Sequence, residues 1–262
     1  MIRLFLSVDM VGSTQFKARF TGQGSEGWLE IFRAFFCNFP LMLAGQVGFE
    51  FIEDEATPSI DVWKAMGDEV IFAAEPKSAD EAVSILRALL RAMALYEGKY
   101  FERLPLRLKG TAWLVAFGTQ NIELDIAELA AGDGARHIDY IGPDVDLGFR
   151  LGKFARPSSL VVSLDLLEQL LGATNADVLA FHLVGRDELK GVMFGRPYPV
   201  VWASDADAGF DFMPWEVEEC PLVAAAIDAP PTDMSRLRET IDDIRFYLRK
   251  MHGIDRVPLT LG

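Results

Sequence analysis

Cysteine and histidine, which often mark disulfide scaffolds, metal sites and catalytic sites, are scarce in this chain of 262 residues. The two cysteines, Cys37 and Cys220, supply no disulfide framework. Both lie among apolar residues, so we expect buried thiols. Of the three histidines, only His137 lies near a motif that indicates function. The composition therefore excludes a disulfide-stabilised scaffold.

Basic residues are also in the minority, with 25 Lys and Arg against 39 Asp and Glu and a net charge of −14. Non-specific nucleic-acid binding needs a basic surface that neutralises phosphates, and this composition does not provide one. We therefore expect no nucleic-acid partner. An acidic protein also repels a nucleotide triphosphate, so binding one would favour a site bridged by metal ions.

Long uninterrupted apolar runs are missing as well. Arg3 and Asp9 interrupt the apolar start, so no signal peptide is expected. The most apolar helical segment carries Glu30, Arg33 and Pro40, which argues against a membrane span. These observations predict a cytoplasmic protein with no membrane partner. Half of the residues are apolar, which permits a sizeable core.

The hydrophobic pattern predicts an α+β sandwich, with helices packed on a mostly antiparallel sheet. A capping-box spacing from Ser78 to Glu81 predicts the start of a helix that runs to about Tyr96. Pro40 predicts a kink or break in an earlier helix, and residues 118–136 are expected to form an irregular insertion. The other expected helices are 26–45, 145–154 and 164–171, and the expected strands are 2–8, 49–52, 60–64, 69–74, 106–117, 160–163, 180–183 and 198–202.

The composition changes after Ala203. Residues 204–232 are rich in Asp, Glu and Pro and are expected to form a linker, and residues 233–252 are expected to form a charged helix. That helix is free to pack on the body or on a partner. We therefore divide the chain into a catalytic domain, 1–203, and an acidic linker with a C-terminal helical extension, 204–262.

Two aspartates follow apolar strands in tight turns. Asp9 precedes Gly12-Ser13-Thr14, where Ser13 or Thr14 is expected to cap a helix, and Asp68 lies at the tip of a predicted hairpin. If the two turns lie side by side, the carboxylates can hold two divalent cations that clamp a triphosphate.

A third segment carries a helical spacing after Gly142-Pro143. Asp146 and Arg150 are four residues apart, so they share one helix face. An arginine in that position can contact a phosphoryl group in a transition state.

Taken singly, these residues have simpler interpretations. Asp9 alone fits a helix N-cap, Asp68 a turn residue, Lys64 an edge-strand charge, and Arg150 a solvated charge paired with Asp146. Their joint occurrence in this order favours a site.

With these motifs, residues 2–203 resemble the class III nucleotidyl cyclases. The resemblance implies a ferredoxin-like sandwich, in which Asp9, Asp68 and the Met10 carbonyl hold two Mn²⁺ or Mg²⁺ ions. It implies that the turn from Met10 through Val11, Gly12, Ser13 and Thr14 receives phosphates. In that family a Lys and an Asp recognise the base by hydrogen bonds, and Lys64 and Asp139 match them. An Arg stabilises the transition state, and Arg150 matches it. Asp146 departs from the family's Asn, and a carboxylate cannot donate as an amide does.

The segment from Asp139 to Arg150, with Asp at position 146, is more closely similar to the pyrimidine cyclases of the Pycsar anti-phage systems, as is Arg107-Leu108-Lys109-Gly110-Thr111. This resemblance implies UTP or CTP as the substrate, and we predict UTP. It also implies that the product, a cyclic pyrimidine nucleotide, acts as a messenger for a separate effector protein. It also implies a head-to-tail homodimer whose two equivalent sites are shared between protomers.

The residues alone do not select the base. Lys64 donates and Asp139 accepts, which suits uracil, cytosine and adenine and disfavours guanine. Phe149 is large enough to fill space beside a pyrimidine, although a helical Phe is more often part of a core.

Two rival functions stay open. Met66-Gly67-Asp68-Glu69-Val70 is similar to the hairpin of diguanylate cyclases, but Met66 stands where that family has a Gly. An inactive nucleotide-binding or dimerisation module is the second rival, and Asp146 is the feature that favours it.

Overall fold

A computed structural model of the chain describes residues 1–20, 24, 26–126 and 136–261. In these residues a seven-stranded sheet has the order β2-β3-β1-β4-β7-β9-β8, and β5 and β6 form a separate pair. Neighbouring strands are antiparallel except β4 and β7, which are parallel. The predicted α+β class is confirmed. The strands are β1 (Ile2–Val11), β2 (Ile60–Met66), β3 (Glu69–Ala74), β4 (Arg107–Ala116), β5 (Ile122–Asp125), β6 (Ile138–Ile141), β7 (Leu160–Val162), β8 (Leu179–Asp187) and β9 (Tyr198–Asp205).

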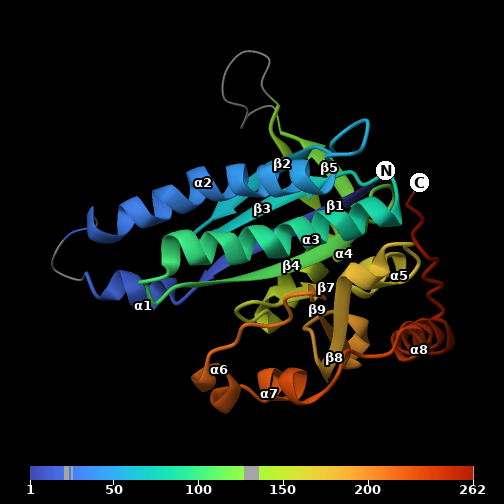
Figure 1. The fold of residues 1–262 in the computed structure, drawn as a ribbon. Helices are drawn as coiled ribbons and strands as arrows, with labels where there is room; N and C mark the ends of the chain where they lie inside the picture. The colour runs from blue at the N-terminus through green and yellow to red at the C-terminus, as the bar shows by residue number, and fades with distance from the viewer. Residues whose placement is uncertain (21–23, 25, 127–135, 262) are drawn as a thin grey trace.

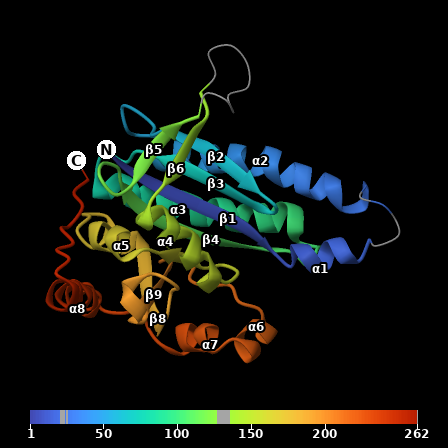
Figure 2. The ribbon, with the colours of Figure 1, turned by 180° about the vertical axis from the view of Figure 1, so that it is seen from behind.

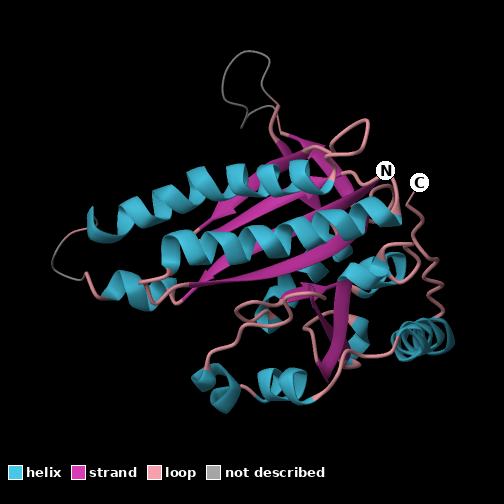
Figure 3. Cartoon of the chain, viewed as in Figure 1, coloured by secondary structure: helices cyan, strands magenta, loops and turns pink. Residues whose placement is uncertain are grey.

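Two long helices, α2 and α3, lie side by side across one face of the sheet (Figure 1, Figure 3). Figure 2 shows α4 and the β5–β6 pair on the opposite face. The α-helices are α1 (Ser13–Ala18), α2 (Glu26–Glu50), α3 (Ala79–Tyr96), α4 (Pro143–Leu151), α5 (Leu164–Leu170), α6 (Pro214–Glu219), α7 (Pro221–Asp228) and α8 (Met234–His252). Short 3₁₀ and π segments are Glu97–Phe101, Gly152–Phe154, Ala176–Val178 and Met193–Gly195.

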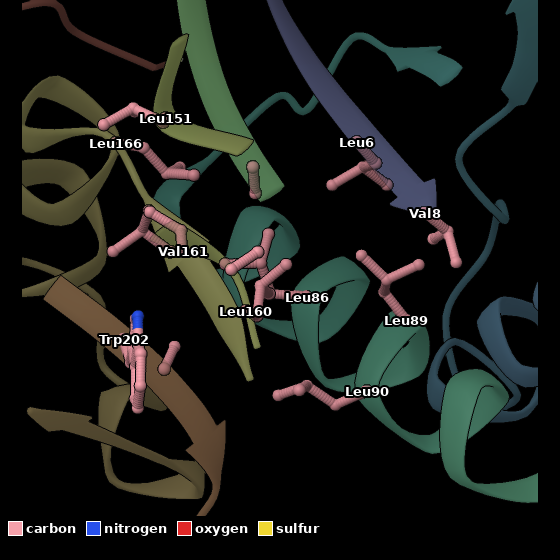
Figure 4. Close-up of a cluster of buried hydrophobic side chains, with 14 of the residues drawn as sticks. Leu6, Val8, Leu86, Leu89, Leu90, Leu151, Leu160, Val161, Leu166 and Trp202 are labelled. Carbon is pink, nitrogen blue, oxygen red and sulfur yellow. The ribbon is translucent and has the colours of Figure 1, made fainter. Parts of the chain in front are cut away.

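The two-residue period of a strand divides β1 between two environments. Leu4, Leu6 and Val8 belong to the large core formed with α2 and α3 (Figure 4). Phe5 belongs to a smaller aromatic core on the other face. By the same alternation, Asp9 lies on the face of Phe5. The sheet therefore presents its polar strand ends on the side of α4.

Helix α2 is longer than the sequence pattern predicts. Residues 49–52, predicted as a strand, instead complete the helix and the turn after it, because Val47 and Phe51 continue its buried face. Pro40 lies inside the helix, which continues on both sides of it. The missing amide of one proline is thus tolerated within a well-packed helix.

Helix α3 begins as predicted. Ser78 is extended at the N-cap, its hydroxyl accepts from the Glu81 amide, and the Glu81 carboxylate accepts from the Lys77 amide at 2.7 Å. At α1 the prediction is wrong, because Gly12 rather than Ser13 or Thr14 occupies the N-cap. The Ser13 hydroxyl instead donates to Asp68.

Two other expectations are corrected. The insertion at 118–136 contains strand β5, which pairs with β6; residues 127–135 of that insertion lie outside the described residues. The cysteines are not buried thiols, since Cys37 is exposed and Cys220 is partly exposed.

The chain beyond Ala203 completes β9 and then packs on the body. The predicted linker contains α6 and α7, and the predicted charged helix is α8. The Arg245 guanidinium pairs with Glu168 of α5, and the apolar side of α8 is buried at Leu237, Ile241 and Ile244. These contacts bring the C-terminal helix against α5.

Among the described residues, α2 is the one helix with the length and apolar composition to cross a membrane. Its Phe35, Phe39 and Leu43 side chains lie in the core, and core helices of globular domains often meet the same criteria.

Candidate active site

Asp9 lies within β1, two residues before the strand ends, rather than in the predicted turn, and Asp68 lies in the turn between β2 and β3. Asp9 is opposite Glu69 in the β1–β3 register, and the Met10 amide donates to the Asp68 carbonyl at 3.2 Å. The structure thus brings together the two aspartates that the sequence singled out, and adds Glu69 as a third carboxylate.

Each carboxylate has a polar partner. Lys109 Nζ lies 2.9 Å from Asp9 Oδ2, the Ser7 hydroxyl donates to Glu69, and the Ser13 hydroxyl donates to Asp68. Burial raises the pKa of the Glu69 carboxyl, and the neighbouring charges of Asp9 and Asp68 raise that pKa further, outweighing Ser7 and Lys109. Among the described residues, Lys109 is the one ion-pair partner that these three carboxylates have.

A hollow of about 170 Å³ opens beside these groups. Asp9, Glu69, Lys109 and Thr111 line it from the sheet, and Phe149 and Lys153 line it from α4 and the short helix that follows. Its sheet side carries the acidic groups together with Lys109, and Lys153 adds a second ammonium group from the opposite side.

The turn after β1 depends on Gly12. Its φ of 86° is left-handed, and an added Cβ would lie 2.7 Å from the Pro105 carbonyl oxygen. Met10 and Val11 end β1, with the Met10 side chain buried, and Ser13 and Thr14 begin α1. Glycine is therefore required for β1 to turn sharply into α1 beside Asp68.

Lys64 and Asp139 form a second group. Lys64 Nζ lies 2.6 Å from Asp139 Oδ1 and 4.3 Å from the centroid of the Trp63 ring. A bulge between Val62 and Lys64 leaves Lys64 opposite Ile71, on the α4 face of the sheet. Burial disfavours ionisation of Asp139, but hydrogen bonds from Lys64 and the Tyr140 amide outweigh it and lower the pKa of Asp139. The fold therefore favours the ionised form of the Asp139 carboxyl.

Asp146 and Arg150 form the third group, on α4. Arg150 Nη1 lies 3.4 Å from Asp146 Oδ2, and the two side chains are 37% and 63% exposed. Between them, Phe149 is 38% exposed and packs against Trp63 and Trp113 at centroid distances of 6.1 and 5.9 Å. Phe149 is thus a partly exposed aromatic side chain rather than a core residue.

Helix α4 is held close to the sheet. An added Cβ on Gly148 would lie 2.1 to 2.4 Å from Trp113 ring atoms. At its N-terminus, Asn121 donates to Asp144 at 2.7 Å and accepts from the Asp144 amide at 3.1 Å. These contacts fix the helix that carries Asp146 and Arg150.

Within the described residues, no hydrogen bond or ion pair joins the Asp9–Asp68 group to the Lys64–Asp139 pair or to Arg150. His137 lies just before β6, where its carbonyl accepts from the Ile126 amide at 2.8 Å. One protomer therefore presents these groups as separate parts.

The acidic group fits a hard divalent cation. Carboxylate oxygens of Asp9, Asp68 and Glu69 are the ligands that Mg²⁺ and Mn²⁺ prefer. In the part of the chain that the structure describes, no three His, Cys, Asp or Glu side chains alone enclose a metal ion. An ion held here would complete its coordination with water and substrate phosphates, as Mg²⁺ usually does.

Sequence reasoning missed Ser7, Glu69 and Lys109 as members of the site. Glu69 directly follows Asp68, and Lys109 is a charged residue in a strand whose second half is apolar, so each left a signal. Only the strand register, with Asp9 opposite both Glu69 and Lys109, shows that they meet.

No family model matches the sequence, and neither does any curated protein. Solved structures match the fold. The adenylyl cyclase CyaB from P. aeruginosa is 16% identical with a TM-score of 0.55, over 78% of this chain and 94% of that one. The guanylate cyclase domain of RhGC from Catenaria anguillulae in complex with GTP is 14% identical with a TM-score of 0.52, over 78% and 96%. The adenylate cyclases from Trypanosoma brucei in their monomeric state are 14% identical with a TM-score of 0.52, over 81% and 91%. The chain has the class III nucleotidyl cyclase fold.

Proposed function

We propose that this chain is a nucleotidyl cyclase that converts UTP into 3′,5′-cyclic UMP and pyrophosphate. One observation carries the proposal: Asp9 and Asp68 lie side by side on a class III cyclase fold. The Lys64–Asp139 pair and Arg150, on the same face of the sheet, supply the remaining parts of such a site.

In the proposed reaction the ribose 3′ oxygen attacks the α-phosphorus. A new oxygen–phosphorus bond forms, the bond from the α-phosphorus to the bridging oxygen breaks, and pyrophosphate leaves while the 3′ proton passes to water. Asp9, Asp68 and the Met10 carbonyl would hold two Mn²⁺ or Mg²⁺ ions, which supply charge neutralisation and a more acidic hydroxyl. The amides from Met10 to Thr14 would receive phosphates, and Arg150 would stabilise the developing charge.

Lys64 and Asp139 would read the base. The Lys64 ammonium donates to a carbonyl oxygen and the Asp139 carboxylate accepts from N3–H of uracil or the amino group of cytosine. Phe149, backed by Trp63 and Trp113, adds bulk that favours a pyrimidine over a purine. Cytidylate and adenylate cyclase activity are the alternatives with the same site.

The proposed enzyme is a head-to-tail homodimer with two shared sites. Supporting this, the metal-binding and base-reading groups of one protomer make no direct contact in the described residues. By the motif resemblance, the cyclic nucleotide would act as a second messenger in anti-phage defence, read by a separate effector protein.

The test is to incubate the purified protein with Mn²⁺ and each nucleoside triphosphate separately, and to identify products by mass. Cyclic UMP is expected from UTP. A cyclic purine nucleotide as the sole product would overturn the pyrimidine assignment.

A second candidate is an inactive nucleotide-binding module, favoured by Asp146, which is an acceptor where the family has an amide donor. That candidate predicts bound nucleotide, measured by calorimetry, with no cyclic product from any of the triphosphates.

A further inference from the structure

A partly buried ion-pair bridge at the N-terminus of α4 involves the C-terminal segment. Arg256 Nη2 lies 2.7 Å from Asp144 Oδ1, and Arg256 Nε lies 3.0 Å from Asp165 Oδ1. Asp144 is in the first turn of α4 and Asp165 is in the first turn of α5. One guanidinium therefore joins the N-termini of two helices.

The two carboxylates of the bridge are largely shielded from solvent, and the arginine is partly exposed. The Asp144 and Asp165 side chains are 16% and 8% exposed, and Arg256 is 35% exposed. Without Arg256 the two carboxylates would face each other in a poorly solvated place, which costs far more than losing a surface ion pair. A planar guanidinium is suited to bind both carboxylates at once.

The segment that carries Arg256 is itself anchored. The Phe194 and His252 rings stack at 3.8 Å between centroids, and the Leu261 side chain is buried. Gln169 of α5 donates to the Leu259 carbonyl at 2.5 Å. Arg256 is thus held from both sides of its own segment.

A second arginine of the C-terminal region provides a contrast. Arg245 pairs with Glu168, which is also on α5, and in the described residues no hydrogen bond or ion pair joins Arg245 or Glu168 to α4. Arg245 and Arg256 therefore both dock the C-terminal region on α5, but only Arg256 also reaches Asp144.

We propose that Arg256 is a positioning residue, which bridges Asp144 to Asp165 and so fixes α4 with its Asp146 and Arg150 in place for the reaction. The part that concerns the reaction rests on the proposed function. The part that concerns α4 does not depend on it.

The first measurement is hydrogen–deuterium exchange of the full chain, with peptides that cover residues 143–151. We expect Arg256→Gln to speed exchange in these residues by about tenfold, because local opening of α4 becomes easier. Arg245→Gln should leave them unchanged while loosening α8. Wild-type exchange in 143–151 of Arg256→Gln would overturn the proposal.

The second measurement is steady-state kinetics with UTP and Mn²⁺. Misplacing Arg150 weakens contacts made in the transition state, so Arg256→Gln should lower kcat by about tenfold or more and leave KM within about twofold. Arg245→Gln should keep kcat within about twofold. Equal losses of kcat in the two variants would overturn the proposal, because that pattern indicates a general structural role.

Arg256→Lys keeps the charge, but an ammonium group lacks the planar set of donors with which a guanidinium binds both carboxylates at once. It should fall between wild type and Arg256→Gln in both measurements, and it replaces Arg256→Gln if that variant does not fold. A wild-type protein that forms no cyclic nucleotide would refute the proposed function, and the exchange measurement would still decide the role of Arg256.

Discussion

The candidate metal site brings three carboxylates close together with a single lysine beside them. Asp9, Asp68 and Glu69 meet at one end of the sheet, and Lys109 pairs with Asp9. Because like charges repel strongly where water is scarce, such a group is ready to accept a divalent cation.

Replacing either aspartate should remove turnover. Asp9→Asn and Asp68→Asn each weaken a metal ligand that supplies several kcal/mol of transition-state stabilisation. We expect a fall in kcat of about a thousandfold or more, with a circular dichroism spectrum like that of the wild type. Turnover near the wild-type rate in either variant would rule out a two-metal site.

Lys109 should compete with a metal ion for Asp9. Lys109→Met removes the ammonium 2.9 Å from Asp9 Oδ2, so Mn²⁺ affinity without nucleotide should rise by about tenfold, or about 1.4 kcal/mol. Electron paramagnetic resonance titration measures this. The control is Lys153→Met, which lines the same hollow but pairs with Asp187. Equal or weaker affinity in Lys109→Met would contradict the competition.

The Lys64–Asp139 pair should appear in the acid dependence of stability. The pKa of Asp139 is lowered in the fold, so the pair stabilises the protein above the unfolded-state pKa of about 3.9 and is lost as the pH falls through the lower folded value. The melting temperature of Asp139→Asn should be lower than that of the wild type from pH 7 to pH 5. This gap in melting temperature should shrink below about pH 4. Asp146→Asn, at an exposed pair, should show little gap at any pH. A gap for Asp139→Asn that is unchanged at pH 3 would be inconsistent with this account.

At the scale of single residues, sequence motifs could predict Asp9, Asp68, Lys64, Asp139 and Arg150, because each follows a recognisable turn or helix signal. Partners such as Lys109 and Ser7 could not be predicted, since strand register decides which of them meet. The same holds for the exposure of Cys37, which depends on which face of α2 packs.

At the scale of elements, α4 is the helix on which the site depends most. Gly148 allows it to approach Trp113 closely, and Asn121 holds its first turn. The position of Asp146 and Arg150 therefore follows from the contacts that α4 makes with Trp113 and Asn121 rather than from their own exposed pairing.

Gly148→Ala should push α4 away from Trp113. The new methyl would overlap the ring, and we expect a loss of about 1–3 kcal/mol in the free energy of unfolding. The control is Gly152→Ala, where an added Cβ meets Thr111 Oγ1 at 3.7 Å, an ordinary contact. Urea denaturation measures both, and equal stabilities would show that the close approach is not needed.

Elements with a local signal could be predicted well, as the capped helix α3 and the strands β3 and β7 illustrate. The extension of α2 through residues 49–50 and the strand β5 could not. Both depend on long-range packing, in the first case against the core and in the second against β6.

At the scale of the whole molecule, the two faces of the sheet differ in kind. Helices α2 and α3 cover one face (Figure 1), where the main core lies, and α4 covers the other (Figure 2). The three candidate groups lie on the α4 side. The C-terminal segment, which the sequence left free to pack on the body or on a partner, packs on the body.

The central claim is that this chain is a cyclase whose site combines Asp9 and Asp68 of one protomer with Lys64, Asp139 and Arg150 of another. The most direct test is to mix Asp9→Asn and Arg150→Ala proteins, each inactive alone, under conditions of proven subunit exchange. Half of the dimers are then mixed and each has one intact site, so we predict about a quarter of wild-type cyclic UMP formation. Exchange without any regain of product would contradict the claim.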